Sequence, residues 1–121
     1  MIAGVYNIFC EQGTTFSRTF ELQYPDNVDT SIYYPYDLSG YTARMQVRRT
    51  IDSPNVLIEL TTENGGIEID AVHGKITVFM SAEQTAGLTS SGVYDLEIVD
   101  NGGGVSRVVQ GSFTLSFEVT R

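Results

Sequence analysis

Apolar and polar residues alternate along several stretches of this chain with the period of two that is typical of β-strands. The clearest stretch runs from 41 to 49, where Tyr41, Ala43, Met45 and Val47 form one face and Thr42, Arg44, Gln46 and Arg48 form the other. Residues 56–62 and 93–99 repeat the pattern. Each stretch is expected to place one face in a core and the other in water.

Further strands are expected near both ends of the chain. Residues 5–10 are short, apolar and aromatic, and 14–24 alternate. Arg18 interrupts the apolar face of the second stretch, so we expect a bulge or a strand end there. Residues 105–119 predict one long strand, with Gly111 as its bend.

The middle of the chain predicts one hairpin and one short helix. Residues 67–70 are expected to pair with 75–80 across a short loop. Ser81 followed three residues later by Gln84 fits a capping box, and Gly87 ends the helical signal. This helix is expected to be a crossover turn between strands.

The elements together predict an all-β fold, an antiparallel β-sandwich of about seven to eight strands with very little helix. The length of 121 residues fits a single domain, residues 1–121. Charged residues make up only 18%, so the polar surface is largely Thr, Ser, Asn, Gln and Gly, which suits strands and turns. The expected core consists of Met45, Val47, Ile58, Leu60, Ile76, Val78, Leu96, Ile98, Phe113, Leu115 and Phe117.

The formal net charge is −8, from 15 acidic and 7 basic residues. Such a field repels phosphate groups, so neither nucleic acid nor an acidic membrane surface is an expected partner. Cys10 is the single cysteine, which excludes an internal disulfide; it is expected to be a small apolar strand residue in a reducing compartment. With no signal peptide and no long apolar run, synthesis in a cytoplasm is expected.

Residue types that carry chemistry are scattered. His73 is the single histidine and is expected to be a solvated turn residue, since no second His or Cys lies at a metal-binding spacing. Asp95 and Glu97 share one face of a strand, which is more typical of an exposed face than of an acid–base pair. We therefore expect no catalytic residue and no small-molecule substrate.

Two loops resemble ligand sites only superficially. Asp26, Asp29 and Asp37 lack a known calcium-binding spacing. Residues 101–104 are glycine-rich but lack the Lys-Ser/Thr and the helix of a phosphate loop, so a hairpin tip is expected. No metal and no cofactor is predicted.

The basic residues suggest a contact surface. Arg44, Arg48 and Arg49, with Arg18 expected nearby, form the only basic cluster, and Arg44 and Arg48 share the wet face of one strand. They either meet an acidic patch on a neighbouring copy or pair with carboxylates on adjacent strands. The pattern alone does not choose between these alternatives.

The sharpest feature is a Tyr-rich loop, residues 25–38. It contains Tyr33, Tyr34 and Tyr36 beside Pro35 and reads as a long loop or a loose hairpin. Tyrosine is favoured at binding surfaces because it combines large apolar area with a polar tip. We predict a protein interface here; the alternative is a loop that folds back and caps one end of the sandwich.

Several of these segments, in this order, resemble small tailed-bacteriophage virion proteins. They are Gln-Gly-Thr-Thr-Phe-Ser-Arg at 12–18, Asp-Leu-Ser-Gly-Tyr-Thr-Ala-Arg-Met-Gln-Val-Arg at 37–48 and Gly-Val-Tyr-Asp-Leu-Glu at 92–97. The chain resembles the N-terminal domain of phage baseplate upper proteins and its single-domain relatives, over roughly residues 5–119. It departs from them in the longer segment 25–38 and in stopping at Arg121 without a coiled coil or receptor-binding module.

The resemblance implies an immunoglobulin-like sandwich that joins virion parts without enzymatic activity. The expected function is a tail, baseplate or neck adaptor, made in the host cytoplasm and carried in the virion, with other virion proteins and copies of itself as partners. A head decoration protein is one alternative. A receptor- or carbohydrate-binding module using the Tyr-rich loop is another, weakened by the absence of tryptophan. A hydrolase is the most distant possibility, and the position in the particle is left open.

Overall fold

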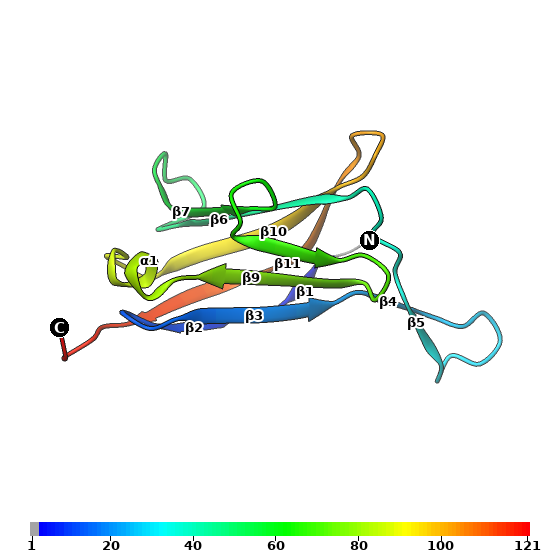
Figure 1. Cartoon of the computed structure of the whole chain (residues 1–121), viewed down its shortest axis with the longest axis horizontal. Coiled ribbons are helices and arrows are strands. Elements are labelled where there is room, and N and C mark those ends of the chain that lie inside the picture. Colours follow the sequence, from blue (N-terminus) through cyan, green and yellow to red (C-terminus); the bar gives the residue numbers. More distant parts are fainter. Residues whose placement is uncertain (1–2) are drawn as a thin grey trace.

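The structure, a computed structural model, describes residues 3–121. Strands account for 51% of these described residues and helix for 4%, which confirms the all-β prediction. The elements are β1 (Gly4–Val5), β2 (Ile8–Glu11), β3 (Phe16–Glu21), β4 (Gln23–Pro25), β5 (Tyr33–Pro35), β6 (Thr42–Arg48), β7 (Val56–Thr61), β8 (Ile67–Asp70), β9 (Lys75–Met80), α1 (Ala82–Ala86), β10 (Gly92–Val99) and β11 (Val105–Ser116). Figure 1 shows their arrangement.

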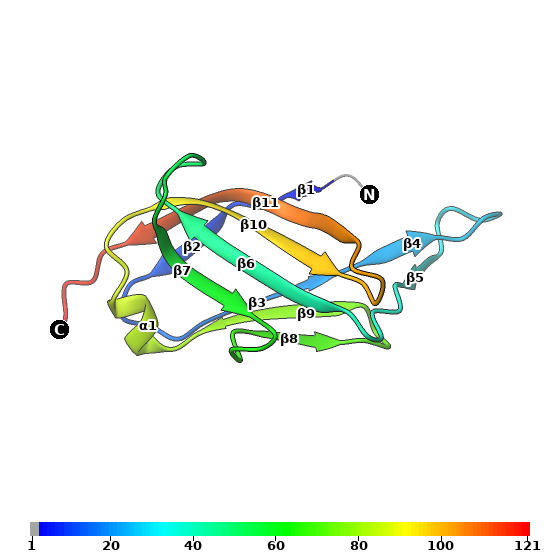
Figure 2. The same ribbon diagram turned by 90° about the horizontal axis from the view of Figure 1, so that it is seen from above.

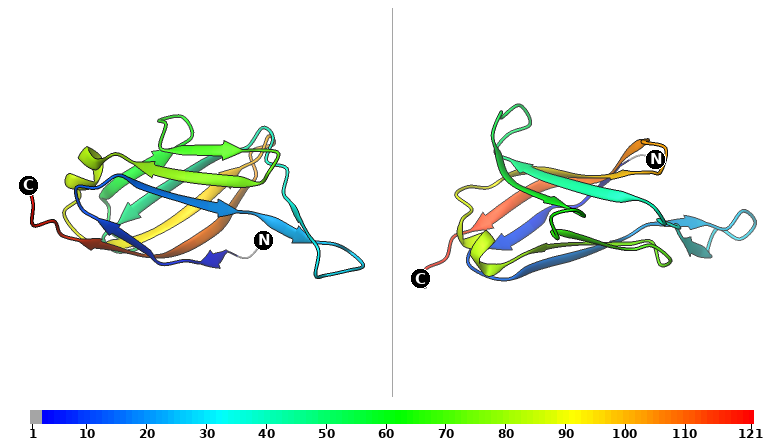
Figure 3. Two further views of the ribbon diagram at one scale, coloured as in Figure 1. Left: turned by 60° about the horizontal axis from the view of Figure 1, so that its bottom comes forward. Right: turned by 45° about the horizontal axis from the view of Figure 1, so that its top comes forward.

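The strands form two larger sheets and one separate hairpin. The first sheet has the order β1-β11-β10-β6-β7, and β2 pairs with a later part of β11. The second has the order β3-β9-β8, and β4 pairs only with β5. The two larger sheets lie face to face (Figure 3), and buried residues from both fill the space between them.

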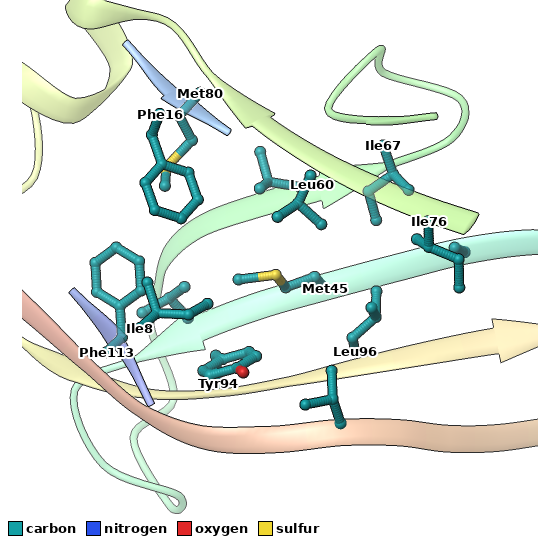
Figure 4. Packing of buried hydrophobic residues seen from close by; sticks show 14 of the residues in the cluster. Ile8, Phe16, Met45, Leu60, Ile67, Ile76, Met80, Tyr94, Leu96 and Phe113 are labelled. Carbon is teal, nitrogen blue, oxygen red and sulfur yellow. The ribbon is translucent and has the colours of Figure 1, made fainter. Parts of the chain in front are cut away.

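The core is made by the alternation that the sequence predicts. Figure 4 shows Met45 and Leu96 of the first sheet facing Ile76 of the second. Nine of the eleven predicted core residues are buried, and Ile58 is half-buried. The prediction is wrong for Phe117, whose side chain is 63% exposed because β11 ends at Ser116 and the following backbone leaves the sheet.

The N-terminal strand differs from the prediction in two ways. It is divided into β1 and β2, and both parts run parallel to β11 rather than antiparallel. At the division, the Asn7 side-chain oxygen accepts a hydrogen bond from the Ser112 amide at 3.1 Å, in place of a backbone acceptor. Gly111 lies against the Tyr6 carbonyl where a β-carbon would collide, so its small size serves this close approach. The irregularity of β11 lies instead at Val108, where its register with β10 shifts.

Arg18 does not produce the expected bulge. β3 pairs with β9 without interruption, and Arg18 lies opposite Val78. Its guanidinium carbon lies 4.7 Å from the centre of the Phe16 ring, and it donates to the Phe9 carbonyl at 3.3 Å. The side chain reaches along the apolar edge to bring its charge to the surface, so the strand does not need to bend.

The helix forms as the capping box predicts. The Gln84 amide donates to the Ser81 hydroxyl at 3.1 Å, and the Ser81 amide donates to the Gln84 side-chain oxygen at 2.8 Å. Helix α1 ends at Ala86, and Gly87 is its C-cap residue. Within residues 3–121, no helix has the length and apolar character needed to cross a membrane.

Candidate functional site

The Tyr-rich segment is a β-hairpin that projects from one end of the molecule, opposite the end where the chain terminates (Figure 2). Tyr24 lies directly opposite Tyr34, and Pro25 opposite Tyr33. The prolines are tolerated because neither β4 nor β5 has a second neighbouring strand that needs their missing N–H groups. The sequence allowed either a long loop or a loose hairpin, and the structure has the hairpin.

The tip of the hairpin is held by its own aspartates. The Asp26 carboxylate accepts hydrogen bonds from the Val28 and Asp29 amides, both at 2.9 Å. Asp29 in turn accepts from the Ser31 amide at 3.1 Å and from its hydroxyl at 2.6 Å. Such contacts of an aspartate with the backbone two or three residues later stabilise tight turns. The tip therefore has a defined conformation although its side chains are exposed.

Three tyrosine rings gather on one face of the hairpin and form the tyrosine cluster, Tyr24, Tyr34 and Tyr36. The ring centres of Tyr24 and Tyr34 lie 5.7 Å apart, and those of Tyr24 and Tyr36 5.3 Å apart, both within the range of favourable aromatic pairs. These side chains remain 44%, 41% and 37% exposed in chain order. The cluster is thus fixed by ring contacts and still open to a partner.

The cluster differs by one member from the predicted set. Tyr34 and Tyr36 are in it, but Tyr33 is on the opposite face of the hairpin beside Pro25 and is 57% exposed. Tyr24 was missed because its position continues the alternation of residues 14–24, which places it on the same side of an extended strand as Phe20 and Leu22. Its nearness to three other tyrosines in the sequence was a signal that could have found it.

The root of the hairpin is bonded to the turn between β8 and β9. The Leu22 amide donates to the Gly74 carbonyl at 2.8 Å, and the Leu38 amide donates to the Ala71 carbonyl at 3.0 Å. The Tyr36 amide closes the root by donating to the Leu22 carbonyl at 2.9 Å. Leu22 and Leu38 are buried, so these leucines cover this end of the core while the tyrosines lie beyond it.

The hairpin region is negatively charged. Between Leu22 and Tyr41 the sequence contains Asp26, Asp29 and Asp37 and no lysine, arginine or histidine. Hydrogen bonds from the Asp29 and Val28 amides and from the Tyr34 hydroxyl hold the pKa of Asp26 below its usual value. The Ser31 hydroxyl and amide lower the pKa of Asp29, and the Ser39 hydroxyl and amide lower that of Asp37. These carboxylates are therefore ionised at neutral pH.

The predicted basic cluster is only partly assembled. Arg44 forms an ion pair with Glu97 on the adjacent strand at 2.9 Å, and Arg48 donates to the Ser53 carbonyl and the Gln46 side chain, both at 2.8 Å. Of the two alternatives that the sequence left open, Arg44 pairs with a carboxylate on an adjacent strand. The expectation that Arg18 lies near them is wrong, because Arg18 belongs to β3 in the other sheet.

A shallow depression of about 810 Å³ covers the outer face of the first sheet, and Arg44 and Arg48 line it together with Arg107. We call this surface the arginine face. Arg107, which the sequence reasoning did not single out, pairs with Asp95 at 3.4 Å. Its signal was weak, because a single arginine in an irregular strand does not indicate which carboxylate lies opposite.

The remaining candidate residues lie in turns or in the core. His73 is exposed in the β8–β9 turn, with its Nδ1 2.9 Å from the Asp70 carboxylate. Cys10 is buried, and desolvation raises the pKa of its thiol. Asp100 accepts from the Gly102 and Gly104 amides at 2.9 and 2.8 Å, which makes 101–104 the expected hairpin tip. Among the described residues, no three His, Cys, Asp or Glu side chains are grouped so as to hold a metal ion.

No protein-family model matches this chain, and no curated protein matches it either.

Proposed function

We propose that this protein is a structural protein of a tailed-bacteriophage virion, a tail, baseplate or neck adaptor that acts by binding other proteins. The observation that carries the proposal is the tyrosine cluster on a projecting hairpin. Its three half-exposed rings lie outside the core, yet root bonds and turn bonds hold the backbone beneath them.

Such a hairpin suits protein binding for a thermodynamic reason. Ordering side chains and loops at an interface opposes association, and a surface that is already ordered loses less entropy on binding. Tyrosine adds large apolar area with few rotatable bonds and a hydroxyl that tolerates the wet rim of an interface. Here the Tyr34 hydroxyl donates to Asp26 at 3.1 Å, which further restricts that ring.

The strand order supports an immunoglobulin-like sandwich, as the resemblance to phage baseplate upper proteins implies. If β3, β6, β7, β8, β9, β10 and β11 are given the letters B, C, C′, D, E, F and G, the sheets read B-E-D and G-F-C-C′. This is the grouping of strands in variable-type immunoglobulin domains. The tyrosine hairpin then occupies the B–C connection, at an end of the sandwich where binding loops are common in such domains.

One observation favours the receptor- or carbohydrate-binding alternative. The Asp26 carboxylate beside the Tyr34 ring combines a hydrogen-bond acceptor with an aromatic face, as sugar sites often do. However, the rings are inclined to one another, by 41° for Tyr24 and Tyr34 and by 64° for Tyr24 and Tyr36, and do not make a flat platform. Protein contact is the better fit. Binding to a glycan array by the isolated chain would reverse this preference.

The test is incorporation into particles. The wild-type chain should be found by mass spectrometry in gradient-purified virions of the phage that encodes it. Replacing Tyr34→Ala with Tyr36→Ala should leave a folded domain, seen by circular dichroism, that is lost from the particles. The matched control is Phe9→Ala with Phe117→Ala, which also removes two exposed aromatic rings but outside the hairpin.

Two results would contradict the proposal. Absence of the wild-type chain from purified virions would remove the virion role. Normal incorporation of the hairpin variant, with loss of the Phe9 and Phe117 variant, would move the contact surface to the other end of the molecule. A decoration role is distinguished by finding the chain on isolated heads and not on isolated tails.

A further inference from the structure

One surface of this acidic protein has no net formal charge. The arginine face is lined by three of the seven basic residues, Arg44, Arg48 and Arg107, and by only three of the fifteen acidic ones, Glu59, Asp95 and Glu97. The rest of the chain therefore carries the whole formal charge of −8. Any acidic partner meets the least electrostatic repulsion on this face.

The arginines of this face are more accessible than the carboxylates that pair with them. The Arg44 side chain is 52% exposed and that of Glu97 27%; Arg107 is 51% exposed and Asp95 40%. The contact between Arg44 and Glu97 uses Nε, so it does not occupy the two terminal nitrogens of Arg44. A guanidinium has five N–H donors and pairs well with a second carboxylate. In these two pairs the guanidinium group is therefore more accessible to a partner than the carboxylate.

The depression also offers apolar contact. Val5 and Ile51 line it and are 75% and 88% exposed. Arginine and aliphatic side chains around a shallow hollow suit a partner with aromatic rings and carboxylates, since guanidinium groups stack on aromatic faces as well as bind anions.

The tyrosine hairpin of this same protein has those properties. It presents three clustered rings on one face, and three ionised aspartates lie along it and at its root, with no basic residue between Leu22 and Tyr41. Exposed Val28 and Ile32 add apolar area at the tip. Hairpin and arginine face are therefore complementary in charge and in side-chain chemistry.

The hairpin and the arginine face lie on different parts of the molecule, so the hairpin of one copy can reach the face of another. The hairpin projects from one end of the sandwich (Figure 2), whereas the arginine face lies on the outer side of β6, β10 and β11. We infer that the tyrosine hairpin of one copy docks on the arginine face of the next copy. This inference rests on the proposed function and names a second copy of the chain as a partner of the hairpin.

Such a contact joins two different surfaces, so it is heterologous. A pair joined in this way still has one free hairpin at one end and one free arginine face at the other. Heterologous contacts of this kind generate a closed ring or an open filament. Both forms agree with a protein that is assembled in several copies in a particle.

The test uses two variants that each destroy one surface. The hairpin variant is Tyr34→Ala with Tyr36→Ala, and the face variant is Arg44→Glu with Arg107→Glu. Each alone should weaken self-association by at least about thirty-fold, as expected for the loss of central anchors. Sedimentation velocity measures the association, and circular dichroism checks the fold. The charge-matched control, Lys75→Glu with Arg121→Glu, changes the net charge equally outside the face and should associate like the wild type.

Mixing the two variants gives the decisive measurement. The hairpin variant keeps an intact face and the face variant keeps an intact hairpin, so an equimolar mixture should form one-to-one dimers and nothing larger. If the mixture stays monomeric while the wild type associates, the hairpin of one copy does not dock on the arginine face of the next, and the inference is wrong. Raising the salt concentration should weaken the mixed dimer, because the charges are at the surface.

The two proposals fail in distinguishable ways. If the wild-type chain is monomeric even at about 1 mM, the hairpin does not bind a second copy strongly enough to matter, and this inference is wrong. The proposed function then still stands or falls with particle incorporation, because the hairpin would serve a different virion protein. If the chain is absent from virions but the mixed dimer forms, only the virion role fails.

Discussion

Two hairpins of this protein have the same construction and opposite surroundings. β8 and β9 form an antiparallel pair joined by a short turn, and so do β4 and β5 around a longer one. Every second residue of β9 is buried, because β3 flanks it and the first sheet covers its inner face. All residues of β4 and β5 are exposed. Regular pairing alone therefore does not produce burial; a third strand and a facing sheet do.

The comparison shows how an isolated hairpin is retained. A two-stranded hairpin is at best marginally stable in water. In this protein its order comes from three local sources: the root bonds to the β8–β9 turn, the ring contacts of the tyrosine cluster and the aspartate-capped tip. None of these requires burial of the rings. The tyrosines are consequently free for a partner in a way that the apolar residues of β9 are not.

The largest expected effect falls on the buried hairpin. Ile76 of β9 is fully buried between the sheets. Ile76→Ala should lower the free energy of unfolding by roughly 2–5 kcal/mol, through lost apolar burial and the cavity that remains. Urea denaturation followed by circular dichroism measures the change. A loss below about 0.5 kcal/mol, the size of a typical surface effect, would show that β9 is not a core strand.

A smaller but still large effect is expected where the two hairpins meet. Gly74 has a φ of +63°, and a β-carbon there would lie 2.6 Å from the Leu22 carbonyl oxygen and 2.8 Å from that of Tyr36. Gly74→Ala should destabilise the fold by about 1–3 kcal/mol and loosen the hairpin root. Faster hydrogen exchange of the Leu22 and Leu38 amides is the specific readout.

Gly103 provides the control for this substitution. Its φ is +86°, and no atom lies within 4 Å of where a β-carbon would be. Gly103→Ala therefore introduces only the backbone strain. The contradicting result is that both variants lose the same stability while hydrogen exchange of the Leu22 and Leu38 amides stays unchanged. That result would show that the contact of Gly74 with the Leu22 and Tyr36 carbonyls does not hold the hairpin.

Acid should loosen the tyrosine hairpin before the sandwich. Hydrogen bonds lower the folded-state pKa of Asp26. The ionised Asp26 carboxylate therefore stabilises the folded hairpin fully at pH values above its unfolded-state pKa of about 3.9. This stabilisation is lost as the pH falls through the folded-state pKa. Amide chemical shifts of Val28 and Tyr34, recorded by NMR from pH 6 to about pH 2, should therefore change below about pH 4. In Asp26→Asn the transition at Val28 should disappear; an unchanged transition would assign it to another group.

The smallest effect on stability is expected for Tyr33→Ala. Tyr33 lies on the face of the hairpin opposite the tyrosine cluster, and its side chain is more than half exposed. Its removal should change the free energy of unfolding by less than about 0.5 kcal/mol, measured by urea denaturation. A loss of more than about 1 kcal/mol would show that this face of the hairpin packs on the domain, which would return the segment to the role of a cap.

Local signals in the sequence predicted much of the fold. The alternation of 41–49 and 93–99 identified β6 and β10 and the correct inner face of each. The exchange of hydrogen bonds between Ser81 and Gln84 depends on residues three positions apart, so the helix could be predicted from sequence alone. These features are determined by the chain within a few residues.

Other features were decided by contacts between distant segments. Phe117 continues the alternation of β11 and is nevertheless exposed, since the strand loses its partner β2 after Ser116. Tyr24 continues the alternation of β3, but the sheets end before it and it joins Tyr34 instead. In both cases the period of the pattern was correct, and the extent of the neighbouring strand decided the outcome.

The candidate surfaces divide in the same way. The sequence by itself determined that a tyrosine-rich, proline-interrupted and acidic segment stands between two strands, because composition and turn chemistry are local properties. Only the tertiary structure decided that Tyr24 belongs to the cluster and that Arg107 joins Arg44 on one face. Both groupings depend on strand register. The register of β4 with β5 places Tyr24 opposite Tyr34, and the register of β6, β10 and β11 within one sheet brings residues more than fifty positions apart onto one face.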